Sequence, residues 1–142
     1  MTDVRPARDA AEVRAALDLR HEVFVVEQHV PVDEELDEHD DTALHLVAVD
    51  NDRIVATARV VMEGATAKIG RVAVTKSARR RGIASRLIEA GEAHARAEGA
   101  TRVALAAQTG ALALYERAGY TAYGERFMDA NLEHLMMEKH LD

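Results

Sequence analysis

The sequence contains no cysteine and no tryptophan, and only two prolines among 142 residues. Without cysteine, disulfide frameworks, thiolate nucleophiles and thiolate metal sites are all excluded. Aromatic residues make up 4% of the chain, which disfavours a surface that stacks the bases of single-stranded nucleic acid.

Basic residues are also in the minority, with 18 Lys and Arg against 25 Asp and Glu and a net charge of -7. An acidic protein is a poor partner for the phosphates of nucleic acid. No apolar stretch approaches the length of a membrane span, and the N-terminal residues lack the pattern of a signal peptide. We therefore expect a cytoplasmic protein without membrane contact, folded as a single domain over residues 1–142.

The hydrophobic pattern predicts an α/β fold, with a mixed, mostly antiparallel central sheet of six to seven strands flanked by helices. Helices are expected from the N-cap Asp9 to before Pro31, from Gly82 to about Glu98, and over 111–117. The almost entirely acidic segment 33–41 is predicted to be a loop with one helical turn around Leu36. Strands are predicted at 2–6, 43–49, 54–62, 66–74, 101–106, 120–127 and 132–140.

The most informative segment is the turn between the strand that ends at Val74 and the helix that Gly82 opens. The first turn of a helix leaves backbone N–H groups without partners, and the helix dipole adds partial positive charge there. Gly82 allows a tight backbone, while the neighbouring Arg79, Arg80 and Arg81 can reach phosphate oxygens. The turn therefore predicts a binding site for a phosphate-bearing ligand.

The spacing of this turn, Arg79-x-x-Gly82-x-Ala84, resembles the pyrophosphate-binding signature of the GNAT superfamily of N-acetyltransferases. A second segment, A-L-Y-E-R-A-G-Y over 113–120, is similar to the second-helix pattern of the same superfamily. The runs at 20–40, 69–74, 106–108 and 129–137 are similar to its ElaA- and YjcF-like subgroup. The substrates of this subgroup are poorly defined, so the resemblance implies the fold and acetyl-CoA but no acceptor.

The resemblance also implies roles for individual residues. Tyr115 is expected to be the general acid that protonates the leaving thiolate; the alternative is a purely packing role. Backbone groups of 72–74 would hold the pantetheine arm and the thioester. Many superfamily members have asparagine where this chain has Gln108, which leaves the hydrogen bonds made there open. The expected cofactor-binding residues are Val72, Ala73, Val74, Arg79, Arg80, Arg81, Gly82, Ile83, Ala84, Ser85 and Gln108, with no metal.

The general base is left open among Glu27, His45 and His134. An alkylammonium has a pKa near 10.4, so a group must accept its proton before the nitrogen can attack. A histidine in an apolar strand is more often structural than catalytic. Glu27 and the adjacent Gln28 lie in the subgroup's most distinctive segment, and we expect them in the substrate pocket.

Arg59 and Arg71 interrupt apolar strands, so each must be paired or point into a cleft. We expect structural ion pairs with an acid such as Glu27 or Asp129; the alternative is recognition of a substrate carboxylate. The acidic segment either attracts a cationic acceptor or forms a solvated face.

Together these features predict acetyl-CoA-dependent transfer of an acetyl group to a primary amine of a small molecule. A protein or peptide amine is the nearest alternative acceptor, and a non-catalytic acetyl-CoA sensor is an alternative of another class. The expected state is a monomer or a homodimer.

Overall fold

The structure is a computed structural model that describes residues 2–142. Its longer helices are α1 (Ala10–Arg20), the π-helical segment η1 (His21–Glu27), α3 (Ile83–Ala97) and α4 (Leu112–Arg117). Short helical turns are α2 (Val32–Glu35), η2 (Glu38–Asp41), η3 (Lys76–Ala78) and η4 (Thr109–Ala111). The strands are β1 (Asp3–Pro6), β2 (Leu44–Asp50), β3 (Arg53–Glu63), β4 (Thr66–Val74), β5 (Arg102–Gln108), β6 (Thr121–Asp129) and β7 (Leu132–His140).

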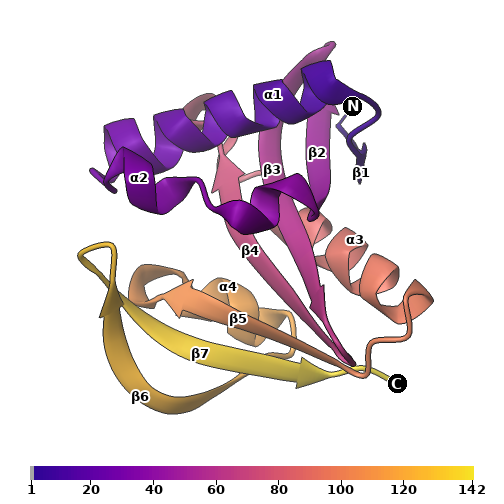
Figure 1. Cartoon of the computed structure of the whole chain (residues 1–142), viewed down its shortest axis with the longest axis vertical. Coiled ribbons are helices and arrows are strands. Elements are labelled where there is room, and N and C mark those ends of the chain that lie inside the picture. The colour runs from indigo at the N-terminus through magenta and orange to yellow at the C-terminus, as the bar shows by residue number, and fades with distance from the viewer. Residues whose placement is uncertain (1) are drawn as a thin grey trace.

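The seven strands form one sheet in the order β1-β2-β3-β4-β5-β7-β6. Neighbouring strands are antiparallel except β4 and β5, which are parallel. The predicted mixed and mostly antiparallel sheet is therefore confirmed. Figure 1 shows β1 to β4 as one half of the molecule and β5 to β7 as the other, joined at the lower end of β4 and β5.

The two halves separate because β4 and β5 pair over only three residues. Thr66–Lys68 of β4 lie opposite Arg102–Ala104 of β5, although both strands continue well beyond this pairing. A bulge also bends β4: its register with β3 shifts between Thr57 and Arg59, and Arg71 has a left-handed φ of 51°. A bulge of this kind redirects a strand and the side chain that it carries.

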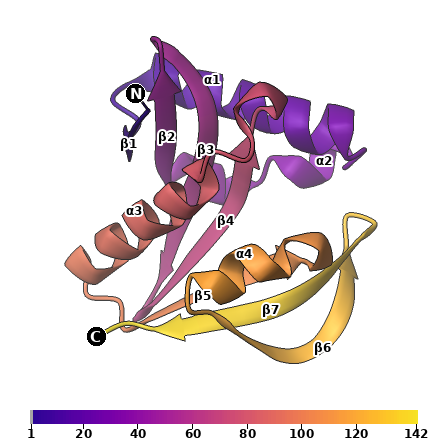
Figure 2. The same cartoon turned by 180° about the vertical axis from the view of Figure 1, so that it is seen from behind.

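Two hydrophobic clusters hold helices against the first half of the sheet. In the main cluster, Leu87, Ile88 and Ala95 of α3 pack on strand residues of β2 to β5. A second cluster joins α1 and η1 to β4 and contains Leu19, Val23, Phe24, Val30 and Ala73. The views of Figures 1 and 2 place α1 and α3 on opposite faces of β2 to β4, and α4 beside β5.

Element bounds agree with the predicted ones to within two residues, except between α1 and β2. The predicted single helix changes at His21 into a π-helical segment, in which Gln28 N–H donates to Val23 C=O over 3.2 Å. This wider turn accompanies burial of the adjacent Val23 and Phe24. The helical turn predicted around Leu36 was misplaced: α2 and η2 lie on either side of Leu36, whose own backbone is extended.

Candidate active site

The predicted anion-binding turn lies at the head of α3. Gly82 has a left-handed φ of 75°, and Arg80 has a left-handed φ of 64°, which costs a non-glycine residue roughly 1–2 kcal/mol. Within residues 2–142 no side chain caps the helix. The N–H groups of its first turn therefore keep their capacity to bind an anion.

A cavity of about 590 Å³ connects this turn with the opening between β4 and β5. This volume is typical of pockets that enclose a small ligand. Its walls are the turn before α3, residues 69–74 of β4, and Tyr115 with its neighbours on α4. Toward η1 and the β6–β7 hairpin it is lined by residues that include Gln28, Gln108 and His134.

The end of β4 offers backbone groups to this cavity. Thr75 N–H donates to Val55 C=O of β3 over 2.8 Å, so strand alternation turns the backbone groups of Val72 and Val74 toward the side that β5 has left. Arg79 Nε already donates to Val74 C=O over 2.9 Å. The Val72 backbone and the Val74 N–H are the groups that face the opening.

Tyr115 lines the cavity from α4 and is only 8% exposed. Burial raises the pKa of its phenol to about 12, so the hydroxyl keeps its proton at neutral pH. No group among residues 2–142 forms a hydrogen bond with that hydroxyl, and its one ring contact is an edge-on approach to Tyr120 with centroids 6.1 Å apart. Tyr115 is thus a proton donor that no other group engages.

The three consecutive arginines occupy different places. Arg79 forms two hydrogen bonds with the Glu27 carboxylate, at 2.7 and 3.0 Å, and Arg80 lines the cavity. Arg81 instead pairs with Asp50 at 3.2 Å and is not part of the cavity wall. Arg81 therefore holds the turn against β2 in this structure, and its contact with the cofactor stays a prediction.

Glu27, one of the three candidate bases, holds Arg79 in place through its carboxylate. The hydrogen bond from Arg79 lowers the pKa of Glu27 from its ordinary value. A carboxylate that is stabilised in its charged form is a weaker proton acceptor, and Glu27 does not line the cavity.

His45 is also distant from the cavity chemistry. It is buried on β2, its Nε2 lies 2.9 Å from the backbone oxygen of Asp40, and it does not line the cavity. The contact ties η2 to the sheet, so the structure gives His45 a structural position and does not support a role as base. His134, the third candidate, does line the cavity from β7.

Two contacts bridge the halves of the sheet on the side of His134. Gln108 Nε2 donates to Gln28 Oε1 over 2.9 Å, joining the end of β5 to the end of η1. Ala130 and Leu132 of the β6–β7 hairpin pack on the second hydrophobic cluster of α1, η1 and β4. Figure 1 shows this hairpin reaching from the lower half toward α2. This side of the cavity is consequently roofed by η1 and the hairpin.

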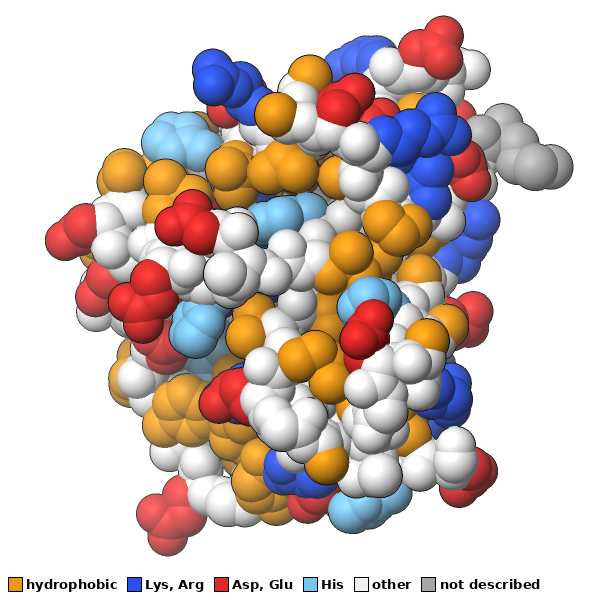
Figure 3. Space-filling model, turned by 45° about the vertical axis from the view of Figure 1, so that its right-hand side comes forward, with side chains coloured by type: hydrophobic (Ala, Val, Ile, Leu, Met, Phe, Trp, Pro, Cys, Tyr) orange, Lys and Arg blue, Asp and Glu red, His pale blue; other side chains and the backbone are white. Residues whose placement is uncertain are grey.

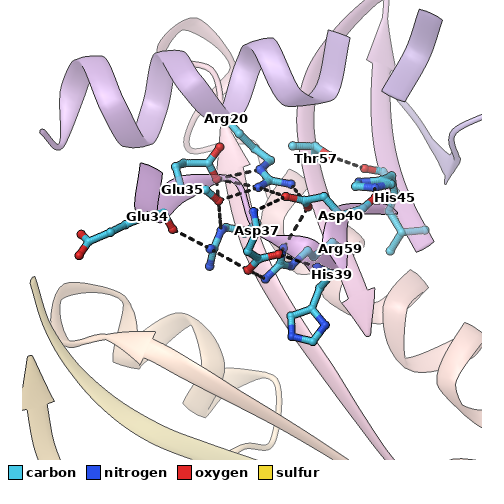
Figure 4. Close-up of polar contacts among 11 residues, drawn as sticks. Arg20, Glu34, Glu35, Asp37, His39, Asp40, His45, Thr57 and Arg59 are labelled. Carbon is cyan, nitrogen blue, oxygen red and sulfur yellow. Dashed lines mark hydrogen bonds and ion pairs between the residues drawn. The ribbon is translucent and has the colours of Figure 1, made fainter. Parts of the chain in front are cut away.

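The acidic segment forms neither a free anionic surface nor a wholly solvated one. Arg20 is 1% exposed and binds Glu35 at 2.8 Å and Asp40 at 2.6 Å. Figure 4 shows the arginine side chains converging on the acidic side chains of α2 and η2. The carboxylates that point inward are therefore neutralised within the protein.

Arg59 and Arg71 complete this network. Arg59 binds Asp37 at 2.6 and 2.8 Å and Asp40 at 3.0 Å. Arg71, which lines the cavity, approaches Glu35 at 3.2 Å and Asp37 at 3.3 Å. The predicted structural ion pairs are present, but their partners come from the acidic segment and not from Glu27 or Asp129.

The described residues offer little to other ligand classes. Among residues 2–142 no group of three or more His, Asp and Glu side chains is placed to hold a metal ion, and no helix there is long and apolar enough to cross a membrane. On the face drawn in Figure 3, basic side chains are scattered among acidic and hydrophobic ones. That face presents no broad basic area of the kind that binds nucleic acid.

Comparison with known proteins identifies the family of the chain that forms this cavity. Residues 6–141 match the model of the acetyltransferase (GNAT) domain. The chain belongs to the GNAT acetyltransferase family. It is 37% identical over 134 residues to the N-acetyltransferase YjcF of Bacillus subtilis, covering 94% of this chain and 96% of that one.

Two solved GNAT structures extend this similarity. An acyl-CoA N-acyltransferase from Pseudomonas aeruginosa is 32% identical, with a TM-score of 0.86 and coverage of 98% of this chain and 99% of the other. Escherichia coli ElaA is 26% identical, with a TM-score of 0.87 over 98% and 99% of the two chains. The predicted relationship to the ElaA- and YjcF-like subgroup is confirmed.

The residues of this cavity fit the acetyl-CoA that GNAT enzymes use. The uncapped α3 turn with Gly82 suits a diphosphate, and the open edge of β4 suits an extended arm that carries amide groups. Gly82 is needed because φ of 75° strains any residue with a Cβ.

Sequence reasoning missed the parts of the site that long-range contacts assemble. It did not pair Arg20 with the acidic segment, nor did it place the β6–β7 hairpin over the cavity. A usable signal existed for the first: Arg20 falls at helical spacing among apolar positions of the first helix, and an acidic run follows nearby in the sequence as a source of counter-charges. No local signal marks the hairpin contact.

Proposed function

We propose that this protein is an acetyl-CoA-dependent N-acetyltransferase that transfers an acetyl group to a primary amine of a small molecule. The proposal rests on one cavity, which lies where β4 and β5 diverge. This cavity joins the uncapped N-terminus of α3 to the buried Tyr115 hydroxyl, which has no hydrogen-bond partner among residues 2–142.

Each part of the cavity has a task in this reaction. The first-turn N–H groups of α3 and the Arg80 side chain would hold the diphosphate, and the Val72 and Val74 backbone would hold the pantetheine arm. When bound, acetyl-CoA supplies an acetyl group that is activated as a thioester. Tyr115 would donate its hydroxyl proton to the leaving sulfur, a transfer that a dry and well-aligned site makes effective despite the raised pKa.

The side of the cavity that η1 and the β6–β7 hairpin cover favours a small-molecule acceptor; the surface of a folded protein would fit it less well. The Gln28–Gln108 hydrogen bond and the packed hairpin restrict entry from that side. The three paired arginines also cancel much of the acidic segment's field, which weakens the expected attraction of cationic acceptors.

The test is thiol release from acetyl-CoA over a panel of primary amines that includes basic peptides, alongside thermal unfolding with and without acetyl-CoA. We expect acetyl-CoA to raise Tm and at least one small amine to be acetylated. Tyr115→Phe should lower kcat by about 100-fold or more while the Tm rise persists, since general acids contribute on the order of 10²-fold or more. An undiminished kcat would remove Tyr115 as the acid, and absence of any Tm rise would refute acetyl-CoA binding.

A further inference from the structure

Three polar side chains cluster on the roofed side of the cavity, where the neighbouring walls are apolar. Gln28, Gln108 and His134 all line the cavity, as do Phe24, Val30 and Leu132 of the roof. Gln108 and His134 are direct cross-strand partners on β5 and β7, so their side chains lie side by side on one face of the sheet. Polar groups in an apolar wall fix the orientation of a ligand.

Each of these side chains retains an unused polar atom. The Gln28–Gln108 hydrogen bond uses Gln28 Oε1 and Gln108 Nε2, which leaves Gln108 Oε1 as an acceptor and Gln28 Nε2 as a donor. His134 Nδ1 lies 2.8 Å from Leu132 C=O. A carbonyl only accepts, so Nδ1 carries the proton and the neutral ring has its lone pair on Nε2.

The His134 ring is held in place while Nε2 stays available. It is 8% exposed and stacks on Phe127 with centroids 5.7 Å apart. Within residues 2–142 Nε2 has no hydrogen-bond partner, yet it is not sealed in the interior. A nine-tenths buried imidazole with a free lone pair in the cavity wall is therefore positioned to accept a proton from a bound molecule.

The other candidate bases in or near the cavity are engaged or solvated. Glu27 is bound by Arg79, His45 lies outside the cavity, and Glu35 is paired with Arg20 and Arg71. Asp129 and Glu34 also line the cavity, but both are exposed to solvent.

We propose that Gln28, Gln108 and His134 form the binding site for the acceptor's amine nitrogen, with His134 Nε2 as the base that takes its proton. This inference rests on the proposed N-acetyltransferase function and names the residues that would receive the acceptor. Gln108 Oε1 accepts one N–H of the amine and aims the nitrogen lone pair, while Gln28 Nε2 donates to a neighbouring acceptor atom.

The acceptor enters as an ammonium and gives one proton to His134 Nε2, which passes it to water. The freed nitrogen forms a bond to the acetyl carbon as the bond from that carbon to sulfur breaks. A second proton leaves the nitrogen to replace the one that Tyr115 gives to the sulfur. The products are an amide, a thiol and one proton.

The decisive variant is His134→Gln, which keeps a polar side chain but cannot serve as a base. With the best primary alkylamine of the panel, its kcat should fall by about 100-fold or more. With hydroxylamine, whose nitrogen is already unprotonated at neutral pH, the rate should stay within about threefold of the unmodified protein, because little base assistance is required. Gln108→Leu should instead raise KM for the alkylamine more than it lowers kcat.

His140→Gln is the matched control, because His140 lies on the same strand as His134 but is 78% exposed and does not line the cavity, and it should leave both rates unchanged. Equal losses with the alkylamine and hydroxylamine in His134→Gln would indicate a structural role and overturn the inference, as would an undiminished alkylamine rate. The Tm rise with acetyl-CoA should persist in every variant. If the unmodified protein acetylates no amine, the proposed function fails. If it acetylates an amine and His134→Gln leaves the alkylamine rate unchanged, only the inference about the acceptor site fails.

Discussion

Replacing Arg20 with methionine should destabilise the protein by about 3–5 kcal/mol, the usual cost of removing one partner from a buried ion pair. Arg20 is 1% exposed, and its guanidinium donates to Glu35 and Asp40 through contacts of 2.6 to 3.1 Å. Methionine fills much of the same volume, so the loss reports on charge more than on packing. Glu35, itself 3% exposed, would retain only the longer contact with Arg71.

Urea unfolding followed by circular dichroism measures this change, together with Tm. For a chain of this size, we expect Tm to fall by roughly 6–20 °C, at about 2–4 °C for each kcal/mol. The double variant Arg20→Met, Glu35→Leu should recover much of the loss, because no uncompensated buried charge remains. The surface pair Arg126–Glu133, with side chains 62% and 46% exposed, supplies a control: Arg126→Met should cost less than about 1 kcal/mol. A loss below about 1 kcal/mol in Arg20→Met would refute the view that this network stabilises the fold.

Two further predictions concern acid stability and the α3 turn. Hydrogen bonding to Arg59 lowers the pKa of Asp37, and although burial acts to raise the pKa of Asp40, its bonds to Arg20, the Asp37 backbone and Arg59 outweigh that effect. Both carboxylates therefore stabilise the fold fully above about pH 4–5 and progressively less as pH falls below their unfolded pKa. In urea titrations at several pH values, Asp40→Asn should reduce the fall of the unfolding free energy with decreasing pH. An unaltered fall would contradict this prediction. Gly82→Val should let the free turn relax from its left-handed conformation, so that acetyl-CoA binding must restore it at a cost of roughly 1–2 kcal/mol. We therefore expect calorimetry to show affinity weakened by about 5- to 30-fold. Arg81→Met should leave that affinity unchanged, and an equal loss in both variants would contradict the distinction.

Local sequence patterns predicted most of the fold correctly because they depend on short-range physics. Strand 66–74 and the helix after Gly82 follow from hydrophobic periodicity and from the conformational freedom of glycine. The π-helical segment from His21 was missed because its register depends on burying Val23 and Phe24 against β4, which no local pattern encodes.

The candidate site was only partly predictable for the same reason. Tyr115 and the turn at 79–85 are contiguous motifs, so their positions could be read along the chain. Whether Glu27, His45 or His134 faces the cavity depends on contacts between residues far apart in sequence. Arg79 forms an ion pair with Glu27, and the backbone oxygen of Asp40 contacts His45. Of these three candidates, only His134 lines the cavity.

The sequence alone determined the family, the sheet with its flanking helices and the position of the proposed acetyl-CoA-binding turn, because each follows from residues that are neighbours in the chain. The tertiary structure decided which charged side chains form stabilising ion pairs and which polar atoms remain available to a ligand in the cavity. Arg20, Arg59 and Arg71 pair with Glu35, Asp37 and Asp40 of the acidic segment, while the divergence of β4 from β5 opens the cavity. Burial and pairing depend on distances in space, and those distances exist only once the chain has folded.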